Sequence, residues 1–380
     1  METATARSEH YTINSPVLNL AFELSNKNWK LGFTVGLGQK PRERSIPARD
    51  LERVFAEIAA AKQRFKLPES TRVVSCYEAG RDGFWLHRAL VAAGVENHVV
   101  DSSSIEVKRR ARHVKTDRLD LGKLLNMLLR YHNGEPKVWS VVHVPDVVEE
   151  DQRQLHRDLG DLKRERAREI NRIKGLLISQ GISLETRGQA KIDLDGVRLW
   201  DGSGLPEGIR GRLRRAQERV EFLSRQILEL EAQRATDIEQ SSRADIHQAR
   251  ALMSLKGIGP TTAWVLVMEF FGWRKFRNRR QVGALSGLAP TPYQSGDSAH
   301  EQGISKSGNR RVRARAIEMA WMWVRYQPES GLSRWYRERF GQGASRQRRI
   351  GIVALARKLL VSLWKFLETG VLPEGAIVKA

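Results

Sequence analysis

The segment Lys115-Thr-Asp-Arg-Leu-Asp120 leads into leucines at helical spacing, namely Leu121, Leu124, Leu125, Leu128 and Leu129. This spacing predicts a helix that begins near Thr116 or Asp117. Asp117 and Asp120 lie three residues apart, so both carboxylates fall on one face of that helix. Two interpretations stay open. The acids either cap the helix and complement its dipole, or form part of a divalent-metal site for phosphodiester chemistry.

Length and charge narrow the class of protein. The 380 residues suffice for two or three domains with separate cores. A net charge of +21 predicts a polyanionic partner, and its spread along the chain favours nucleic acid over a membrane surface. The longest apolar stretch, Ile350–Leu367, contains three basic residues, so no membrane span is expected. A lone cysteine, Cys76, excludes an internal disulfide and a cysteine zinc site, which fits the cytosol.

The N-terminal part predicts a mixed sheet with helices on its faces. Residues 1–15 are expected to be disordered and residues 16–145 to form one domain. Strands are expected at Val17–Phe22, Trp29–Leu37, Glu43–Ala48, Arg72–Tyr77 and Glu96–Val100, and helices at Asp50–Phe65 and Phe84–Ala93. This is the strand order of ribonuclease-H-like (RuvC-like) domains. Glu23 and Glu78 then follow two of the strands, near the helix that carries Asp117 and Asp120.

From about Pro145 the charge density rises and β-branched runs vanish. Residues 146–244 predict two long helices joined across Gly202–Gly208. The second helix has an a/d seam, with apolar residues at steps of three and four: Leu213, Ala216, Val220, Leu223, Ile227 and Leu230. We expect an antiparallel hairpin that serves as a coiled-coil arm. A helical bundle packed on the sheet is the alternative.

Residues 245–380 predict a helical domain with nucleic-acid contacts. Leu255-Lys-Gly-Ile-Gly-Pro260 has the helix-hairpin-helix pattern, whose backbone amides hold a phosphate; a plain turn between helices is the alternative. Gly287–Gly296 is rich in turn formers and is expected to be a loop. Residues with dense positive charge precede and begin a helix that runs through Trp323. The contact residues proposed for nucleic acid are Lys115, Arg118, Lys256, Gly257, Gly259, Lys306, Asn309, Arg310, Arg311 and Arg313.

Three serines lie in the segments expected to contact nucleic acid. Ser305 and Ser307 directly precede the helix led by Asn309, so helix capping explains at least one of them. Ser295 lies between Gln294 and Gly296, where a small neighbour lets the backbone approach a phosphate. An ordinary turn serine and a nucleophile activated by a base or a metal both remain open for Ser295.

Together these motifs resemble the DEDD transposases of the insertion-sequence 110 family, which are bridge-RNA-guided recombinases. The similarity runs from about Leu18 to about Gly370. Its most specific parts are Glu78-Ala-Gly80, Lys115–Asp120, Leu255–Pro260, Gly287-Leu-Ala-Pro290, Gln294-Ser-Gly296 and Ile304-Ser-Lys-Ser-Gly-Asn-Arg310.

The resemblance implies a bacterial cytoplasmic enzyme. Each of its active sites would join the acidic domain of one protomer to the serine domain of another. An acidic tetrad of Glu23, Glu78, Asp117 and Asp120 would bind Mg²⁺, and Ser295 would be the nucleophile. The helical hairpin would mediate dimerisation, and dimers would assemble into tetramers. A structured guide RNA would pair with donor and target DNA. One departure is notable, because the usual first acid of the family is Asp and Glu23 reaches one methylene further.

Three functions follow from these observations. The first is a DNA recombinase that cuts with a serine hydroxyl. The second is a metal-dependent junction endonuclease that uses the same acids with water, for which Ser295 would be dispensable. The third is a non-enzymatic helix-hairpin-helix protein that binds nucleic acid, for which Asp117 and Asp120 would affect only affinity.

Overall fold

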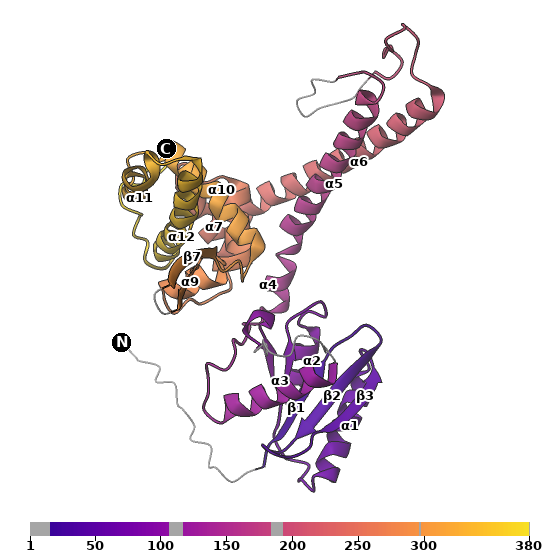
Figure 1. The fold of residues 1–380 in the computed structure, drawn as a ribbon, viewed down its shortest axis with the longest axis vertical. Helices are drawn as coiled ribbons and strands as arrows, with labels where there is room; N and C mark the ends of the chain where they lie inside the picture. The colour runs from indigo at the N-terminus through magenta and orange to yellow at the C-terminus, as the bar shows by residue number, and fades with distance from the viewer. Residues whose placement is uncertain (1–15, 106–116, 184–192, 296–297, 380) are drawn as a thin grey trace. The chain divides into compact units, whose positions relative to one another are not determined.

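The computed structural model describes residues 16–105, 117–183, 193–295 and 298–379 (Figure 1). The expected disorder of residues 1–15 lies outside the described residues. The chain divides into two compact units between Val144 and Pro145. None of the helices in the described ranges is long and apolar enough to cross a membrane.

The first unit contains a mixed five-stranded sheet in the order β3-β2-β1-β4-β5. Its strands are β1 (Leu18–Glu23), β2 (Asn28–Thr34), β3 (Arg42–Pro47), β4 (Val73–Glu78) and β5 (Glu96–Val100). β2 pairs antiparallel with both β1 and β3, whereas β1, β4 and β5 run parallel. The five predicted strands are therefore confirmed, and the topology is compatible with a ribonuclease-H-like fold.

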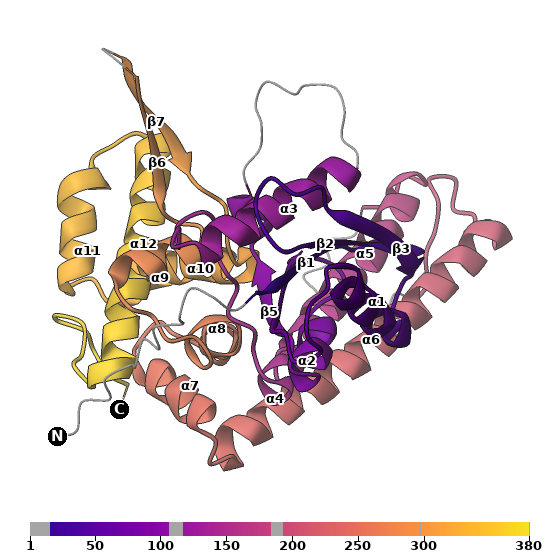
Figure 2. The ribbon, with the colours of Figure 1, turned by 90° about the horizontal axis from the view of Figure 1, so that it is seen from below.

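Helices cover both faces of this sheet (Figure 2). α1 (Leu51–Arg64) and α2 (Trp85–Ala92) lie on one face, and α3 (Asp117–His132) lies on the other; a short 3-10 turn, η1 (Ser102–Ser104), follows β5. Alternation along β1 explains the arrangement, because successive side chains point to opposite faces. Leu20 and Phe22 pack with α1 and α2, whereas Ala21 packs with α3.

The second unit begins with α4 (Val147–Asp151) and a pair of long helices, α5 (Gln154–Ile178) and α6 (Glu207–Gln240). The pair lies side by side (Figure 1). The predicted apolar seam of α6 is buried from Leu213 to Ile227, and Ile173 and Leu177 of α5 pack against its first half. The two predicted long helices are confirmed; their use as a dimerising coiled-coil arm stays a prediction.

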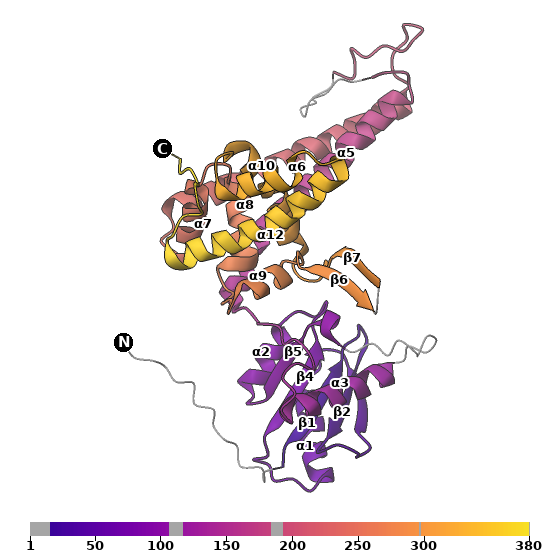
Figure 3. The same cartoon turned by 60° about the vertical axis from the view of Figure 1, so that its left-hand side comes forward.

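The remaining helices of this unit share one hydrophobic core. They are α7 (Ala244–Ser254), α8 (Pro260–Leu266), the π-helical turn η2 (Val267–Phe271), α9 (Arg279–Leu285), α10 (Arg310–Tyr326), α11 (Gly331–Tyr336), a second π-helical turn η3 (Arg337–Gly341), and α12 (Ser345–Thr369). A two-stranded hairpin of β6 (Pro290–Ser295) and β7 (Ser298–Ile304) projects from these helices (Figure 3). The expectation of a plain loop at Gly287–Gly296 is therefore wrong over β6. The prolines and turn formers of this segment predict a loop, but β6 forms because it pairs with β7.

The turn between α7 and α8 has the tight backbone conformation that its two glycines predict. Gly257 has a φ of +90°, in the region that favours glycine, and Ile258 is buried behind it. Gly259 is the N-cap of α8, and Pro260 occupies the first helical turn. A phosphate-binding role for this turn remains a prediction.

Candidate active site

Glu23 and Glu78 are the last residues of β1 and β4, two neighbouring parallel strands. Phe22 pairs with Tyr77, so the glutamates occupy the next position on each strand. Neighbouring strands lie about 4.8 Å apart, which brings the two backbone positions together. Glu78 is exposed and Glu23 is half-buried. Two of the four predicted acids therefore share the carboxyl edge of the sheet.

Alternation places both glutamates on the face that α3 covers. Glu23 follows Ala21 by two residues and Glu78 follows Cys76 by two, and both Ala21 and Cys76 pack in the α3 core. The path of α3 gives the position of its first turn. Its last residue, His132, lies beside Glu96 at the amino end of β5. The helix then passes over the middle of the sheet. There the sulfur of Cys76 lies 3.8 Å from the backbone carbonyl oxygen of Leu124.

α3 therefore crosses the sheet from the amino end of β5 toward β2, where Leu121 packs on Gly32, and its first turn directly precedes that contact in the chain. This turn carries the backbone of Asp117, Arg118 and Asp120. Their side chains, and all of Lys115, lie outside the described residues, so the four-carboxylate site stays a prediction. Carboxylates of this kind supply only oxygen ligands, which suit Mg²⁺. The donor chemistry of Glu23 and Glu78 thus fits the expected ion.

Ser295 lies at the end of β6, where its backbone pairs with Ser298 of β7. The side chain of Ser295 is outside the described residues. β6 ends at Ser295 and β7 begins at Ser298, so the backbone of Ser295 lies at the distal end of the strand pair. A serine at a hairpin tip can approach a separate nucleic-acid strand without entering the helical core.

The other two serines lie where β7 leads into α10, and neither of them caps the helix. Asn309 is the N-cap, because its side chain accepts hydrogen bonds from the amides of Arg311 and Val312. The expectation that Ser305 or Ser307 caps this helix is therefore wrong. Ser305 Oγ is buried and has no hydrogen-bond partner among the described residues.

Close backbone packing shapes the segment that contains Ser305 and Ser307. Gly308 has a φ of +102°, and a Cβ atom there would lie 2.3 Å from the carbonyl oxygen of Leu285. Gly287 is equally restricted, since its Cβ would lie 2.3 Å from the carbonyl oxygen of Ser307. Lys306 adopts a φ of +56° between these contacts. The segment is therefore held in one backbone conformation by Gly287 and Gly308.

Positive charge surrounds the same segment. Lys306, Arg310 and Arg311 are exposed, and the guanidinium of Arg313 donates to the backbone carbonyl of Lys306. Lys256 is also exposed, but beside the glycine turn near the opposite end of α10. Within the described part of the chain none of these five cations forms an ion pair, which leaves them able to meet phosphates. Asn309 caps α10, and its contact with nucleic acid stays a prediction.

A buried acid, Glu269, was not identified from the sequence. It lies in η2, is 1% exposed, and accepts hydrogen bonds from Arg157 Nε at 2.8 Å and Asn309 Nδ2 at 2.9 Å. His156 Nε2 lies 2.9 Å from the same carboxylate. Burial alone would raise the pKa of Glu269, but the hydrogen bonds from His156, Arg157 and Asn309 outweigh it and hold the pKa well below its usual range. The carboxylate therefore links α5 to the start of α10.

Comparison with known proteins gives this chain a family. The family described as "Transposase IS116/IS110/IS902 family" matches residues 249–336. A Sinorhizobium fredii protein named "Putative transposase y4rJ" is 42% identical over 373 residues, which cover 95% of this chain and 94% of that protein. The transposase for insertion sequence element IS1328 of Yersinia enterocolitica is 30% identical over 212 residues, covering 55% of this chain and 60% of that protein.

An insertion element IS110 protein of Streptomyces coelicolor is 26% identical over 255 residues, which cover 57% of this chain and 62% of that protein. The similarity to the Sinorhizobium protein along 95% of this chain defines a DNA-processing enzyme of the transposase class. The chain belongs to the IS116/IS110/IS902 family of insertion-sequence transposases.

Proposed function

We propose that this transposase cuts and rejoins DNA strands through a serine nucleophile at a Mg²⁺-dependent active site. The observation that carries the proposal is the placement of Glu23 and Glu78 on adjacent strand ends, on the face that α3 covers. Asp117 and Asp120 of α3 would complete the acidic group. When bound, Mg²⁺ would stabilise negative charge that develops on the phosphate oxygens.

Ser295 is the nucleophile in this proposal. Its Oγ attacks the scissile phosphorus while the hydroxyl proton passes to a base. The bond from phosphorus to the 3′ oxygen breaks, and that oxygen takes up a proton, leaving a 3′ hydroxyl and a 5′-phosphoserine linkage. Rejoining is the reverse reaction with another strand's 3′ hydroxyl, which displaces the serine. Exposed cations near the hairpin base, such as Arg310 and Arg311, would hold the DNA backbone.

A covalent-adduct assay tests the identity of the nucleophile. Wild-type protein is incubated with labelled DNA of the element ends, the element's non-coding RNA and Mg²⁺, and then denatured. We expect a protein–DNA adduct with wild type and none with Ser295→Ala, which should still bind DNA. Ser305→Ala and Ser307→Ala are the matched controls. An undiminished adduct in Ser295→Ala that is lost in Ser305→Ala or Ser307→Ala would move the role to that serine. Cleavage by wild type with no adduct would favour the junction endonuclease.

Guide RNA is a further part of the proposal, supported by the net charge of +21, which exceeds the need of a short DNA site. Protein purified from cells that express the whole element should carry one discrete RNA. Its binding should weaken steeply with salt. Sequencing of the bound RNA decides the matter, because a pool of random cellular RNA would contradict a guide.

A further inference from the structure

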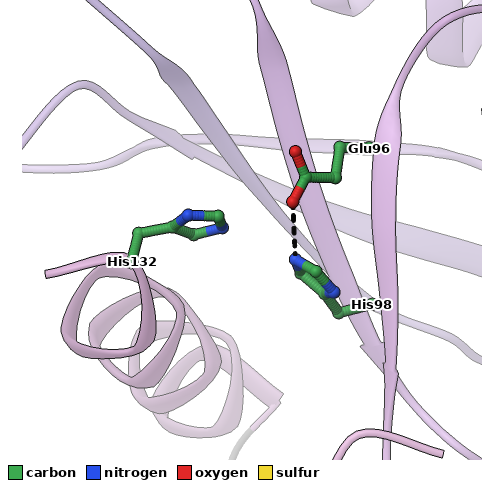
Figure 4. Close-up of side chains that lie close together, drawn as sticks. All are labelled: Glu96, His98 and His132. Carbon is green, nitrogen blue, oxygen red and sulfur yellow. Dashed lines mark ion pairs between the residues drawn. The ribbon is translucent and has the colours of Figure 1, made fainter. Parts of the chain in front are cut away.

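Glu96, His98 and His132 bring three metal-ligating side chains together, away from the carboxyl edge of the sheet (Figure 4). Glu96 and His98 lie on β5, and His132 is the last residue of α3. One ligand atom from each residue lies within 4.8 Å of the other two. Glu96 Oε1 and His98 Nε2 are only 3.1 Å apart.

The surroundings orient these atoms toward one another. Residues 96 and 98 lie two apart on a strand, so both side chains point to the face that α3 covers. Arg72 Nε donates to the other oxygen of Glu96, Oε2, at 3.1 Å, which leaves Oε1 facing the two imidazoles. His98 Nε2 is buried and has no well-directed hydrogen bond within the described residues, although it lies beside the carboxylate.

The donor atoms match those of a transition-metal site. Glu96 offers a carboxylate oxygen, and the rings of His98 and His132 lie side by side with their centroids 5.5 Å apart. Two imidazole nitrogens and one carboxylate suit zinc-class ions, whereas Mg²⁺ requires oxygen ligands.

We propose that Glu96, His98 and His132 bind one zinc-class transition-metal ion, which fastens the last turn of α3 to the start of β5. The helix dipole supports this position, because its carboxyl end favours a cation. Water would complete the coordination. Since α3 also carries Asp117 and Asp120 in its first turn, the ion would steady the helix from the end opposite to the proposed catalytic acids.

Cobalt spectroscopy tests this site independently of DNA cleavage. Full-length protein is stripped with EDTA, dialysed and titrated with Co²⁺, and the visible absorption of the bound ion is followed. We expect one equivalent of bound Co²⁺ to resist excess Mg²⁺ and to be displaced by one equivalent of Zn²⁺. Displacement by Mg²⁺ would place the ion on oxygen ligands and overturn the proposal.

Variants assign the ligands. His132→Ala changes an exposed residue at a helix end, so it should fold, as far-ultraviolet circular dichroism would show. It should lower Zn²⁺ affinity by at least about tenfold, measured by competition with a coloured chelator. The control, His247→Ala, removes an exposed histidine of α7 outside the cluster and should leave affinity unchanged. Equal affinity in His132→Ala and wild type would show that the three residues form only an ion-pair cluster.

Discussion

Glu23 and Glu78 end adjacent parallel strands, one position beyond the register pair of Phe22 and Tyr77, and both alternate to the face that α3 covers. This relationship is fixed by backbone hydrogen bonds of the sheet, not by the side chains themselves. The protein thus positions two carboxylates before any ion binds. Carboxylates on adjacent strand ends would both offer oxygen ligands to a divalent cation.

Substitution at position 23 tests how much the longer side chain matters. Glu23→Asp keeps the charge on the same strand end and should retain Mg²⁺-dependent DNA cleavage. Glu23→Gln removes the charge at equal length and should reduce the cleavage rate by about 100-fold or more, because even outer ligands of metal sites contribute 10–100-fold. Cleavage rates at saturating Mg²⁺ provide the measurement. Equal rates for Glu23→Gln and wild type would remove Glu23 from the site.

Glu269 should be a major determinant of stability in the second unit. Glu269→Ala leaves Arg157 and His156 without their buried partner, which should lower the free energy of unfolding by about 3–5 kcal/mol. Urea unfolding of the full chain measures the change. Glu231→Ala is the control, since its ion pair with Lys163 is more exposed and should contribute about 1 kcal/mol or less. Similar losses in both variants would contradict the importance of burial.

The lowered pKa of Glu269 predicts that the folded state loses stability in acid. Its folded-state pKa lies below its unfolded value, so its stabilisation is complete above about pH 4.5 and is lost as pH falls toward the folded pKa. The pKa of His156 is lowered by burial, so the unfolded state binds its proton first and stability also falls below about pH 6.5. Unfolding free energies of wild type should therefore decline from pH 7 to pH 4, and more steeply than those of a Glu269→Gln, His156→Gln double variant. Parallel pH profiles would refute this assignment.

The two glycines of the α7–α8 turn should respond differently to alanine. Gly257 has a φ of +90°, and its Cβ would lie 3.3 Å from the Met322 carbonyl oxygen, so Gly257→Ala should destabilise the chain by about 1–3 kcal/mol. Gly259 has a φ of −98° and open space around it, and alanine is only a poorer N-cap than glycine, so Gly259→Ala should change stability by about 1 kcal/mol or less. Chemical denaturation distinguishes them, and equal effects would show that the turn does not hold Gly257 in this conformation.

Sequence patterns predicted the first unit well because its elements have strong local signals. β5 was predicted with its observed bounds, Glu96–Val100, and the apolar periodicity of α3 matches its buried leucines. The β6–β7 hairpin was not predicted, since Pro290 and Pro292 lower strand propensity and the pairing is made across the hairpin. Asn309 took the capping position assigned to Ser305 or Ser307, a matter of two to four residues that spacing does not resolve.

The two acid-containing clusters missed from sequence depend on tertiary contacts. Glu269 was the one charged residue in the apolar run Val265–Phe271, a signal that could have marked it as buried. Its partners His156 and Arg157 lie more than a hundred residues earlier. Glu96 and His98 show a local pattern on one strand, but His132 joins them only because α3 ends beside β5.

The helical arm offers a test of oligomerisation. Leu223 is buried and Leu228 is 65% exposed on the same helix, α6. Leu223→Ala should destabilise the chain by about 2–5 kcal/mol, whereas Leu228→Ala should not alter the monomer's stability by more than about 0.5 kcal/mol. If arms pair between copies, Leu228→Ala should weaken the dimer in light scattering after size-exclusion chromatography. A monomeric wild type would contradict the prediction that the arm mediates dimerisation.

The most direct test of metal-assisted cleavage compares wild type with Glu78→Gln, because Glu78 is an exposed strand-end residue whose loss should not disturb the core. Both proteins are given labelled element-end DNA, the element's RNA and Mg²⁺, and strand cleavage and DNA affinity are measured on the same samples. We predict unchanged DNA affinity and a cleavage rate at least about 100-fold lower in Glu78→Gln. Cleavage at the wild-type rate by Glu78→Gln, with Mg²⁺ still required, would contradict the assignment of the active site to this edge of the sheet.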